Sequence, residues 1–334
     1  MSLNQVNLLV GMRDQSGQEL DRGIALSNSV NAVLSAAGYF ALETPVLEQV
    51  ELFVRKSGGQ ISGSLYAFTD PGGQRVSLRP EFTPSVIRHY IESSNDRTGV
   101  CRLRYAGPVF RYDYDDGRAY RQFTQVGAEI VGDAGQIADA EVLGLVLDCL
   151  GAAGIGDAYF TIGHLGLINE ILGSFGLPGS IRQFIVGNLG RLKGDDDESV
   201  DLRTRAEDSG LVFRDTSSRT AGSYQTQLDR EVLMGLFSDT SAAHLGIRSP
   251  EEIVDRLMRK VWEAADPESF WAAVQVLVQL GDLTGDPREV LESAGNLLAS
   301  VGIESRVVAE ITETFDTLAA SDFPFDRTKL DFSF

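Results

Sequence analysis

The sequence is poor in the residues that build disulfide frameworks, metal clusters and membrane spans. Its 334 residues include two cysteines, Cys101 and Cys149, and three histidines, His89, His164 and His244. Two distant cysteines form neither a CxxC site nor a framework, which favours a reducing, cytoplasmic compartment. Three scattered histidines predict no metal site. No apolar run approaches the roughly 20 residues that cross a bilayer, and the start lacks the pattern of a secretory signal, so we expect neither feature.

Basic residues are also scarce. The chain carries 29 Lys and Arg against 48 Asp and Glu, a formal net charge of −19, whereas a general nucleic-acid binder presents a basic face. Residues 1–160 hold 13 basic and 19 acidic side chains, and the remainder holds 16 and 29. Most of the acidity therefore lies outside the motifs described below. The sequence has no GxxxxGK[ST] segment, so a bound nucleotide would not rest in a P-loop.

The composition that is present, 43% hydrophobic and 23% charged, is typical of a globular protein of about two domains. Residues 1–160 alternate between helical and extended patterns. The expected elements are a helix over 21–38, a hairpin over 66–78, a helix starting at Thr83-Pro84, strands over 102–112 and 121–131, and a helix over 138–150 that Gly151 ends. Residues 165–325 are helix-rich and polar.

The two strands between residues 102 and 131 carry the strongest candidate site. On the second strand Phe123, Gln125, Gly127 and Glu129 share one face, because side chains alternate along a strand. Arg111, Gln125 and Glu129 then converge. One interpretation is an amphipathic hairpin with a solvated face. The other is a site for an anion-plus-amine ligand, since arginine offers a planar fork to phosphate or carboxylate, a carboxylate suits an ammonium group, and Phe123 can stack on a base.

The stretch Leu78-Arg79-Pro80-Glu81-Phe82-Thr83-Pro84 is a second candidate. It has the pattern of a strand end, a loop and a helix start. Thr83 as an ordinary helix cap, followed by a proline in the first turn, accounts for part of this pattern. Capping does not explain Glu81.

Together these features resemble class II aminoacyl-tRNA synthetases, and within them the histidyl-tRNA synthetases. The stretch Gly107-Pro108-x-Phe110-Arg111, followed by Arg121-Gln122-Phe123-x-Gln125-x-Gly127-x-Glu129, is similar to the second motif of the class. The segment from Gly38-Tyr39 to Pro45 resembles the first motif, which forms the dimer interface in the family. Arg79-Pro80-Glu81-x-Thr83 resembles the histidine-binding loop, and Gly11-Met12-Arg13-Asp14 resembles the opening of the catalytic domain.

The resemblance implies a role for each matching residue. Histidine, chiefly its ammonium group, would be held by Glu81, Thr83, Gln125 and Glu129. Arg111 would bridge the histidine carboxylate and the ATP α-phosphate and stabilise charge during the reaction. The other ATP contacts would be Asp113 and Phe123 at the adenine and Arg118 or Arg121 at the outer phosphates. Mg²⁺ usually accompanies ATP in this class.

The sequence departs from the family pattern after residue 164. Residues 165–325 form a longer insertion than is usual, and Leu330 to Phe334 resemble the strand that returns to the catalytic domain. We therefore expect a first part of the catalytic domain over 1–164, a helical insertion domain over 165–325, and the returning strand over 326–334. The second histidine-binding motif, the third class motif and an anticodon-binding domain do not occur, so we expect the remainder of the catalytic domain to be absent from this chain.

A non-catalytic relative is the alternative. Some organisms use a histidyl-tRNA synthetase-like protein without an anticodon-binding domain as the regulatory subunit of ATP phosphoribosyltransferase, in histidine biosynthesis. The stretch from Thr161 to Leu167, and Phe123-Thr124-Gln125, resemble that relative, and the acidity fits a protein that does not bind tRNA. Glu81, Arg111, Gln125 and Glu129 instead keep the ligase pattern. His164 is interpreted as part of a domain-junction turn and not as a substrate contact.

We therefore expect an α+β fold, a mainly antiparallel sheet flanked by helices with a helical insertion domain, and a homodimer. The expected function is that of a cytoplasmic histidine–tRNA ligase, which converts histidine and ATP to histidyl-adenylate and pyrophosphate and then charges tRNA(His). In the alternative, the partner is the catalytic subunit of ATP phosphoribosyltransferase.

Overall fold

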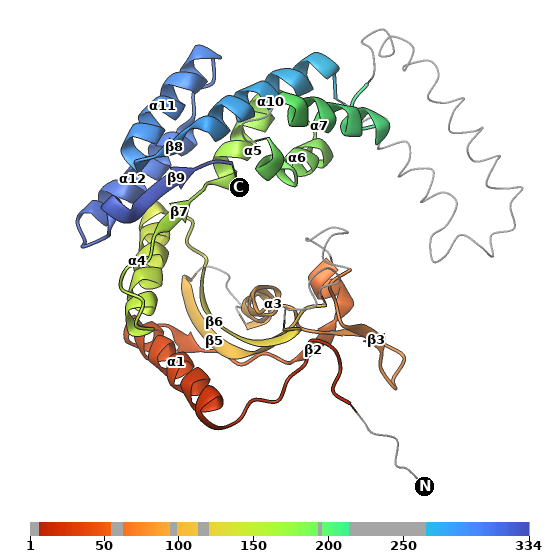
Figure 1. Ribbon diagram of the computed structural model, residues 1–334, viewed down its shortest axis with the longest axis vertical. Helices are drawn as coiled ribbons and strands as arrows, with labels where there is room; N and C mark the ends of the chain where they lie inside the picture. The colour runs from red at the N-terminus through yellow and green to blue at the C-terminus, as the bar shows by residue number, and fades with distance from the viewer. Residues whose placement is uncertain are drawn as a thin grey trace, which may run out of the picture. The chain divides into compact units, whose positions relative to one another are not determined.

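The computed structural model of the protein describes residues 7–54, 63–93, 99–112, 120–192, 196–213 and 265–333. The chain separates into two compact units, Met1–Ala158 (unit 1) and Tyr159–Phe334 (unit 2). Their elements are labelled in Figure 1. The predicted α+β class is confirmed, because helices accompany three sheets whose strand pairs are mostly antiparallel.

A long antiparallel hairpin forms the centre of unit 1. Its strands, β5 (Cys101–Phe110) and β6 (Gln122–Val131), are ten residues each and pair along their whole length. β1 (Phe40–Ala41) adds to β5 in parallel. A second sheet has the order β2-β4-β3, formed by β2 (Leu47–Gln49), β4 (Arg75–Leu78) and β3 (Ala67–Thr69) in antiparallel pairs. The strands and the hairpin predicted for these segments are therefore present.

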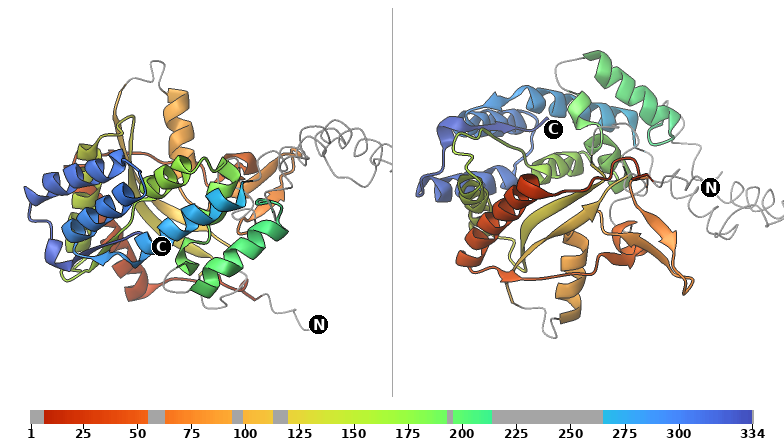
Figure 2. Two further views of the ribbon diagram at one scale, coloured as in Figure 1. Left: turned by 90° about the horizontal axis from the view of Figure 1, so that it is seen from above. Right: turned by 60° about the horizontal axis from the view of Figure 1, so that its bottom comes forward.

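Helices cover both faces of the β5–β6 hairpin, as Figure 2 shows. On one face, α1 (Gly17–Ala36) and α4 (Gln136–Ala152) bury Leu34 and Leu145 against alternate side chains of β6, namely Val126, Ala128 and Ile130. On the other face, α3 (Thr83–Ser93) buries Val86 against β5. Because side chains alternate along β6, successive residues face different helical layers.

Glycines with positive φ follow both helices of the first face. α1 stops at Ala36, and Gly38 has a φ of +87°, as expected of a residue that ends a helix. α4 runs through Gly151 to Ala152, and the positive φ, +80°, falls at Gly154. The predicted end at Gly151 is therefore wrong, because a glycine ends a helix in this way only where it takes the left-handed conformation.

Unit 2 combines helices with a short sheet of order β7-β9-β8. β9 (Thr328–Asp331) pairs in parallel with β7 (Phe160–Ile162) and antiparallel with β8 (Thr284–Gly285). The helices are α5 (Leu165–Ser174), α6 (Gly179–Val186), α7 (Asp196–Asp208), α10 (Pro267–Asp282), α11 (Pro287–Ser300) and α12 (Arg306–Ala319), with 3-10 turns at Leu189–Arg191 and Phe325–Arg327. Ile171, Ile181 and Phe270 are among its fully buried side chains.

The two units divide six residues before the predicted boundary at residue 164, because β7 pairs with β9 inside unit 2. The strand expected within 326–334 is present as β9. Its assignment to the catalytic domain, and the division into 1–164, 165–325 and 326–334, stay predictions. In the described part of the chain, no helix is both long and apolar enough to cross a membrane.

Candidate functional site

Glu129 on β6 is the centre of a hydrogen-bonded cluster in unit 1. The Thr83 hydroxyl, at the first residue of α3, donates to Oε1 of Glu129 at 2.7 Å. The Tyr105 hydroxyl donates to the same oxygen at 3.1 Å. The partner of Thr83 is thus a carboxylate 46 residues along the chain, which helix capping does not explain.

Gly127 makes room for the tyrosine of this cluster. It lies directly opposite Tyr105 in the register of β5 and β6. A Cβ atom at Gly127 would stand only 2.5 Å from Oη of Tyr105 and 2.7 Å from two of its ring atoms. The tyrosine ring therefore passes over the glycine backbone on its way to Glu129, two residues farther along β6.

Gln125 lies on the same strand as Glu129, and Glu81 lies in the loop that precedes α3. Oε1 of Gln125 is buried, and none of the described residues donates a hydrogen bond to it. A buried acceptor of this kind needs a donor, and an N–H group of a ligand is one. The charge of Glu81 contributes to the elevated pKa of Tyr105, after burial and Glu129, so its carboxylate lies within electrostatic range of the cluster.

Arg111 follows the end of β5, and Phe123 lies near the start of β6. Nε of Arg111 donates to the carbonyl oxygen of Pro80 at 3.0 Å, which ties the arginine to the loop that precedes α3. Its guanidinium carbon lies 5.2 Å from the centroid of the Phe123 ring, within cation–π range. Phe123 remains 37% exposed, so the ring keeps surface for a stacking partner.

Arg121 is held at the same end of the hairpin. Its guanidinium stands 4.0 Å from the centroid of the Tyr112 ring, and its backbone N–H donates to the carbonyl oxygen of Gly11 at 2.8 Å. The segment Gly11-Met12-Arg13-Asp14 is thereby placed beside the end of the hairpin. Asp113 and Arg118 lie outside the described residues, so their predicted roles at the adenine and the outer phosphates stay predictions.

Three residues that the sequence analysis did not assign to the site, Arg79, Phe82 and Tyr105, form a stack that packs against Glu129. Arg79 is 3% exposed, and its guanidinium donates to the carbonyl oxygens of Thr44 at 2.6 Å and Pro108 at 2.9 Å. It lies 3.9 Å from the centroid of the Phe82 ring, and Phe82 stacks on Tyr105 with centroids 4.3 Å apart. The strand register, which the sequence does not give, is needed to find this stack.

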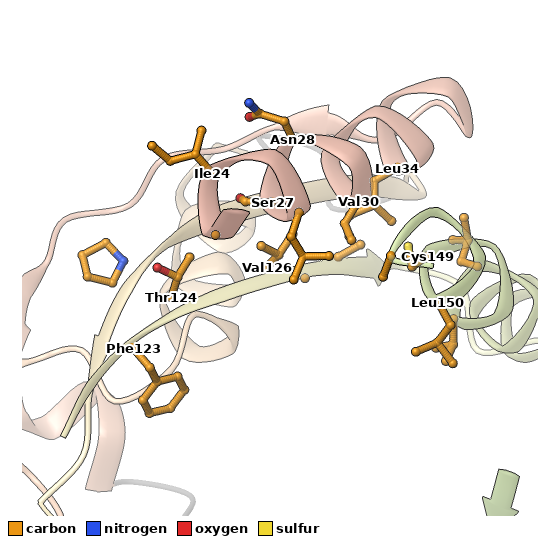
Figure 3. A pocket seen from close by; sticks show the side chains of 18 of the residues that line it. Ile24, Ser27, Asn28, Val30, Leu34, Phe123, Thr124, Val126, Cys149 and Leu150 are labelled. Carbon is orange, nitrogen blue, oxygen red and sulfur yellow. The ribbon is translucent and has the colours of Figure 1, made fainter. Parts of the chain in front are cut away.

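A cavity of about 890 Å³ in unit 1 lies on the opposite face of β6, and Thr83, Tyr105 and Glu129 are not among its lining residues. Its lining comes mainly from α1, α4 and β6, and it includes Phe123 and Gly127. Figure 3 shows Thr124 and Val126 on one side of the strand and the Phe123 ring on the other. Tyr105 and Phe82 are buried and stacked next to Glu129, whereas the lining of the cavity is mainly apolar.

His164 of unit 2 has a structural role. It is the N-cap of α5, and its Nδ1 accepts a hydrogen bond from the backbone N–H of Leu167 at 3.1 Å. The ring also fills the space over Gly166, where a Cβ atom would stand 2.6 Å from it.

A family model described as Histidyl-tRNA synthetase matches residues 11–200, more than half of the chain. The chain belongs to the histidyl-tRNA synthetase family. The match spans the segment from Gly11 to Glu129, so the predicted resemblance to this family is confirmed, while the roles of the individual residues stay predictions.

Curated relatives agree with this family, and solved structures share the fold. The Histidine--tRNA ligase of Sulfurisphaera tokodaii is 32% identical over 203 residues, which is 60% of this chain and 47% of that protein. The chain spans about half the length of the curated relatives it matches. An ATP phosphoribosyltransferase regulatory subunit/histidyl-tRNA synthetase from Bacillus halodurans shares the fold, with a TM-score of 0.62, 20% identity and coverage of 100% of this chain and 69% of that one. A histidyl-tRNA synthetase from Nostoc has a TM-score of 0.63, 15% identity and coverage of 99% and 62%.

Proposed function

We propose that the chain is part of a histidine–tRNA ligase, which activates histidine with ATP and transfers it to tRNA(His). The observation that carries this proposal is the Glu129 carboxylate. Two hydroxyl donors occupy one of its oxygens. The acceptor oxygen of Gln125, four residues earlier on the same strand, is buried without a partner among the described residues. Two acceptors on one strand face suit the N–H groups of an amino acid.

In the proposed reaction a carboxylate oxygen of histidine attacks the α-phosphorus of ATP, a P–O bond forms, and pyrophosphate leaves. Glu129, Glu81, Thr83 and Gln125 would hold the histidine so that its carboxylate points toward Arg111. Arg111, anchored through Nε to Pro80, would stabilise the charge on the phosphoryl oxygens. Such a reaction needs positioning and charge stabilisation and no nucleophilic side chain.

ATP would lie along the end of the hairpin, with its adenine on the exposed face of Phe123. Mg²⁺ usually keeps several waters and binds phosphate oxygens with one or two carboxylates. The donor groups of this face, two carboxylates with hydroxyl and amide groups, suit that ion only when phosphates supply further ligands. The ion would neutralise phosphate charge.

The proposal is tested on the full-length protein by ATP–pyrophosphate exchange with histidine, together with calorimetric titration of histidine. R111A should abolish exchange and leave the fold intact. E129Q should weaken histidine binding by roughly 10- to 100-fold, because hydrogen bonds to charged groups contribute about 1.5–3 kcal/mol. R306A is a matched control, since Arg306 in α12 has 86% of its side-chain surface exposed. Exchange retained in R111A, or unchanged affinity in E129Q, would remove these roles.

A second candidate function is that of a regulatory subunit of ATP phosphoribosyltransferase. Two observations favour it: the solved structure from Bacillus halodurans carries both names, and residues 161–167 resemble that relative. Such a protein would bind histidine without catalysing exchange. Binding of histidine with no exchange, together with assembly with a phosphoribosyltransferase catalytic subunit, would overturn the ligase proposal.

We also propose a homodimer in the cytoplasm. The segment that resembles the first class motif exposes apolar surface that a second copy could cover, with Phe40 75% exposed and Ile24 on α1 51% exposed. Both cysteines are free thiols, which fits a reducing compartment. Light scattering should give twice the chain mass of 36.2 kDa. F40D should shift the mass to that of a monomer, and a monomeric wild-type protein would refute the proposal.

A further inference from the structure

The side chain of Arg121 crosses the backbone of Gly11 in unit 1. A Cβ atom at Gly11 would stand 2.6 Å from Cγ, 2.7 Å from Cδ and 3.1 Å from Nε of Arg121. Carbon atoms attract each other best at about 3.5–4.0 Å, so the arginine stem occupies the space that a larger side chain would need. Gly11 also has a φ of +77°, which glycine adopts without steric cost. Two separate features therefore require glycine at this position.

Arg121 is held at its backbone and at its guanidinium as well. Its N–H donates to the carbonyl oxygen of Gly11 at 2.8 Å, and its carbonyl oxygen accepts from the N–H of Arg111 at 2.9 Å. The guanidinium carbon stands 4.0 Å from the centroid of the Tyr112 ring, within cation–π range. The N–H of Tyr112 donates to the carbonyl oxygen of Ser64 at 2.9 Å, so the ring belongs to an anchored residue.

The segment around Gly11 also contacts the residue before Arg121. The guanidinium carbon of Arg13 stands 3.7 Å from the centroid of the Tyr120 ring. Nη1 of Arg13 pairs at 2.6 Å with Glu19, in the first turn of α1. Residues 11–13 are therefore tied both to α1 and to the end of the hairpin.

From this geometry we infer that Gly11 is a positioning residue, which fixes the direction of the Arg121 guanidinium so that it binds the outer phosphates of ATP. A guanidinium offers a planar fork to phosphate oxygens, and a stem that is already held loses less freedom when the ligand binds. The inference rests on the proposed function, which places ATP along the end of the hairpin. It selects Arg121 over Arg118 for the outer phosphates and adds Gly11, to which the family resemblance gives no role.

The test uses G11A in the full-length protein and calorimetric titration with ATP, with AMP, which lacks the outer phosphates, and with histidine. The added methyl group must displace the arginine stem, so binding of ATP should weaken about tenfold, as expected for one hydrogen bond to a charged group. The affinities for AMP and histidine should stay unchanged. G73A is the matched control, because Gly73 has a φ of +85° and a Cβ atom there would meet nothing within 4 Å. It adds the same kind of backbone strain without moving an arginine, and it should leave all three affinities unchanged.

A double-mutant cycle separates positioning from backbone strain. In an R121A background, G11A should no longer change the ratio of the affinities for ATP and AMP, because the side chain that it displaces is absent. The same cost of G11A with and without Arg121, or an equal loss for ATP and AMP, would overturn the inference.

Y112L decides the inference if G11A does not fold. It removes the ring that supports the guanidinium, so the ratio of the affinities for ATP and AMP should fall, and an unchanged ratio would refute the inference. A wild-type protein that binds no ATP would refute the proposed function instead. A crystal structure of G11A would then decide the inference, since an unmoved Arg121 guanidinium would refute it and a displaced one would support it.

Discussion

Replacing Gly127 by alanine should destabilise unit 1 by about 1–3 kcal/mol, the usual cost of overpacking. The added Cβ would lie 2.5 Å from Oη of Tyr105 and 2.7 Å from Cε2 and Cζ. Favourable carbon contacts are near 3.5–4.0 Å, so the ring must move by about 1 Å. Such a shift carries the hydroxyl, now 3.1 Å from Glu129, beyond hydrogen-bonding distance. G127A should therefore lose stability and weaken histidine binding.

The assay is urea unfolding of G127A followed by far-UV circular dichroism and by tryptophan fluorescence in the same samples. Both tryptophans, Trp262 and Trp271, follow residue 158, so fluorescence reports on unit 2 and dichroism on both units. In a thermal unfolding experiment on a domain of about 150 residues, each kcal/mol of lost stability would lower the melting temperature by roughly 2–4 °C.

G144A is the control, because it should change the stability of unit 1 in the opposite direction. Gly144 lies inside α4, and a Cβ atom there would meet nothing within 4 Å. Because glycine weakens a helix interior relative to alanine, G144A should stabilise unit 1 by about 0.5–1 kcal/mol. If G127A behaves like G144A, or if G127A costs as much in a Y105A background as in wild type, the contact with Tyr105 is not the cause and the reasoning fails.

Three further predictions concern electrostatics and capping. Hydrogen bonds from Arg102 lower the pKa of Glu141, so this carboxylate stabilises the fold above its unfolded pKa of about 4.3. The stability difference between wild type and E141Q should be present at pH 7 and disappear on acidification through the folded pKa; a constant difference in acid titrations would contradict this. D286A should cost about 1 kcal/mol in denaturant unfolding, because the Asp286 side chain caps α11, and no loss would refute that role. Burial raises the pKa of the Cys149 thiol, so iodoacetamide should modify it more slowly than free cysteine, as peptide mass spectrometry would show; an equal rate would refute this.

Much of the fold of unit 1 follows from local patterns. The alternation along 121–131 predicted a strand whose neighbouring residues face opposite ways, and Val126 and Glu129 do lie on different faces. Gly38 was predicted to end its helix and does so. Gly151 was predicted to end the next helix and does not, because the choice between Gly151 and Gly154 depends on which residue takes a positive φ, and both are glycines.

Some residues of the candidate site were predicted from the sequence, and others were found only in the structure. The alternation of side chains along the strand identified Gln125 and Glu129 as candidates, and the resemblance to the family added Thr83 as a histidine contact. Tyr105 was not assigned a role, because an aromatic residue on a strand is most often simply part of the core. Its link to Glu129 depends on the pairing of Tyr105 with Gly127, and that register is a property of two strands together.

The sequence by itself determined the family, the α+β class and the segments that carry the polar groups, since motif order and periodicity are local properties of the chain. Only the tertiary structure decided that Thr83 and Tyr105 share one oxygen of Glu129, that Arg79 and Phe82 support the tyrosine from below, and that the large cavity lies on the other face of β6. These facts depend on contacts between residues 20 to 50 positions apart. Distances of that kind are set by packing and strand register, which no single segment of the sequence contains.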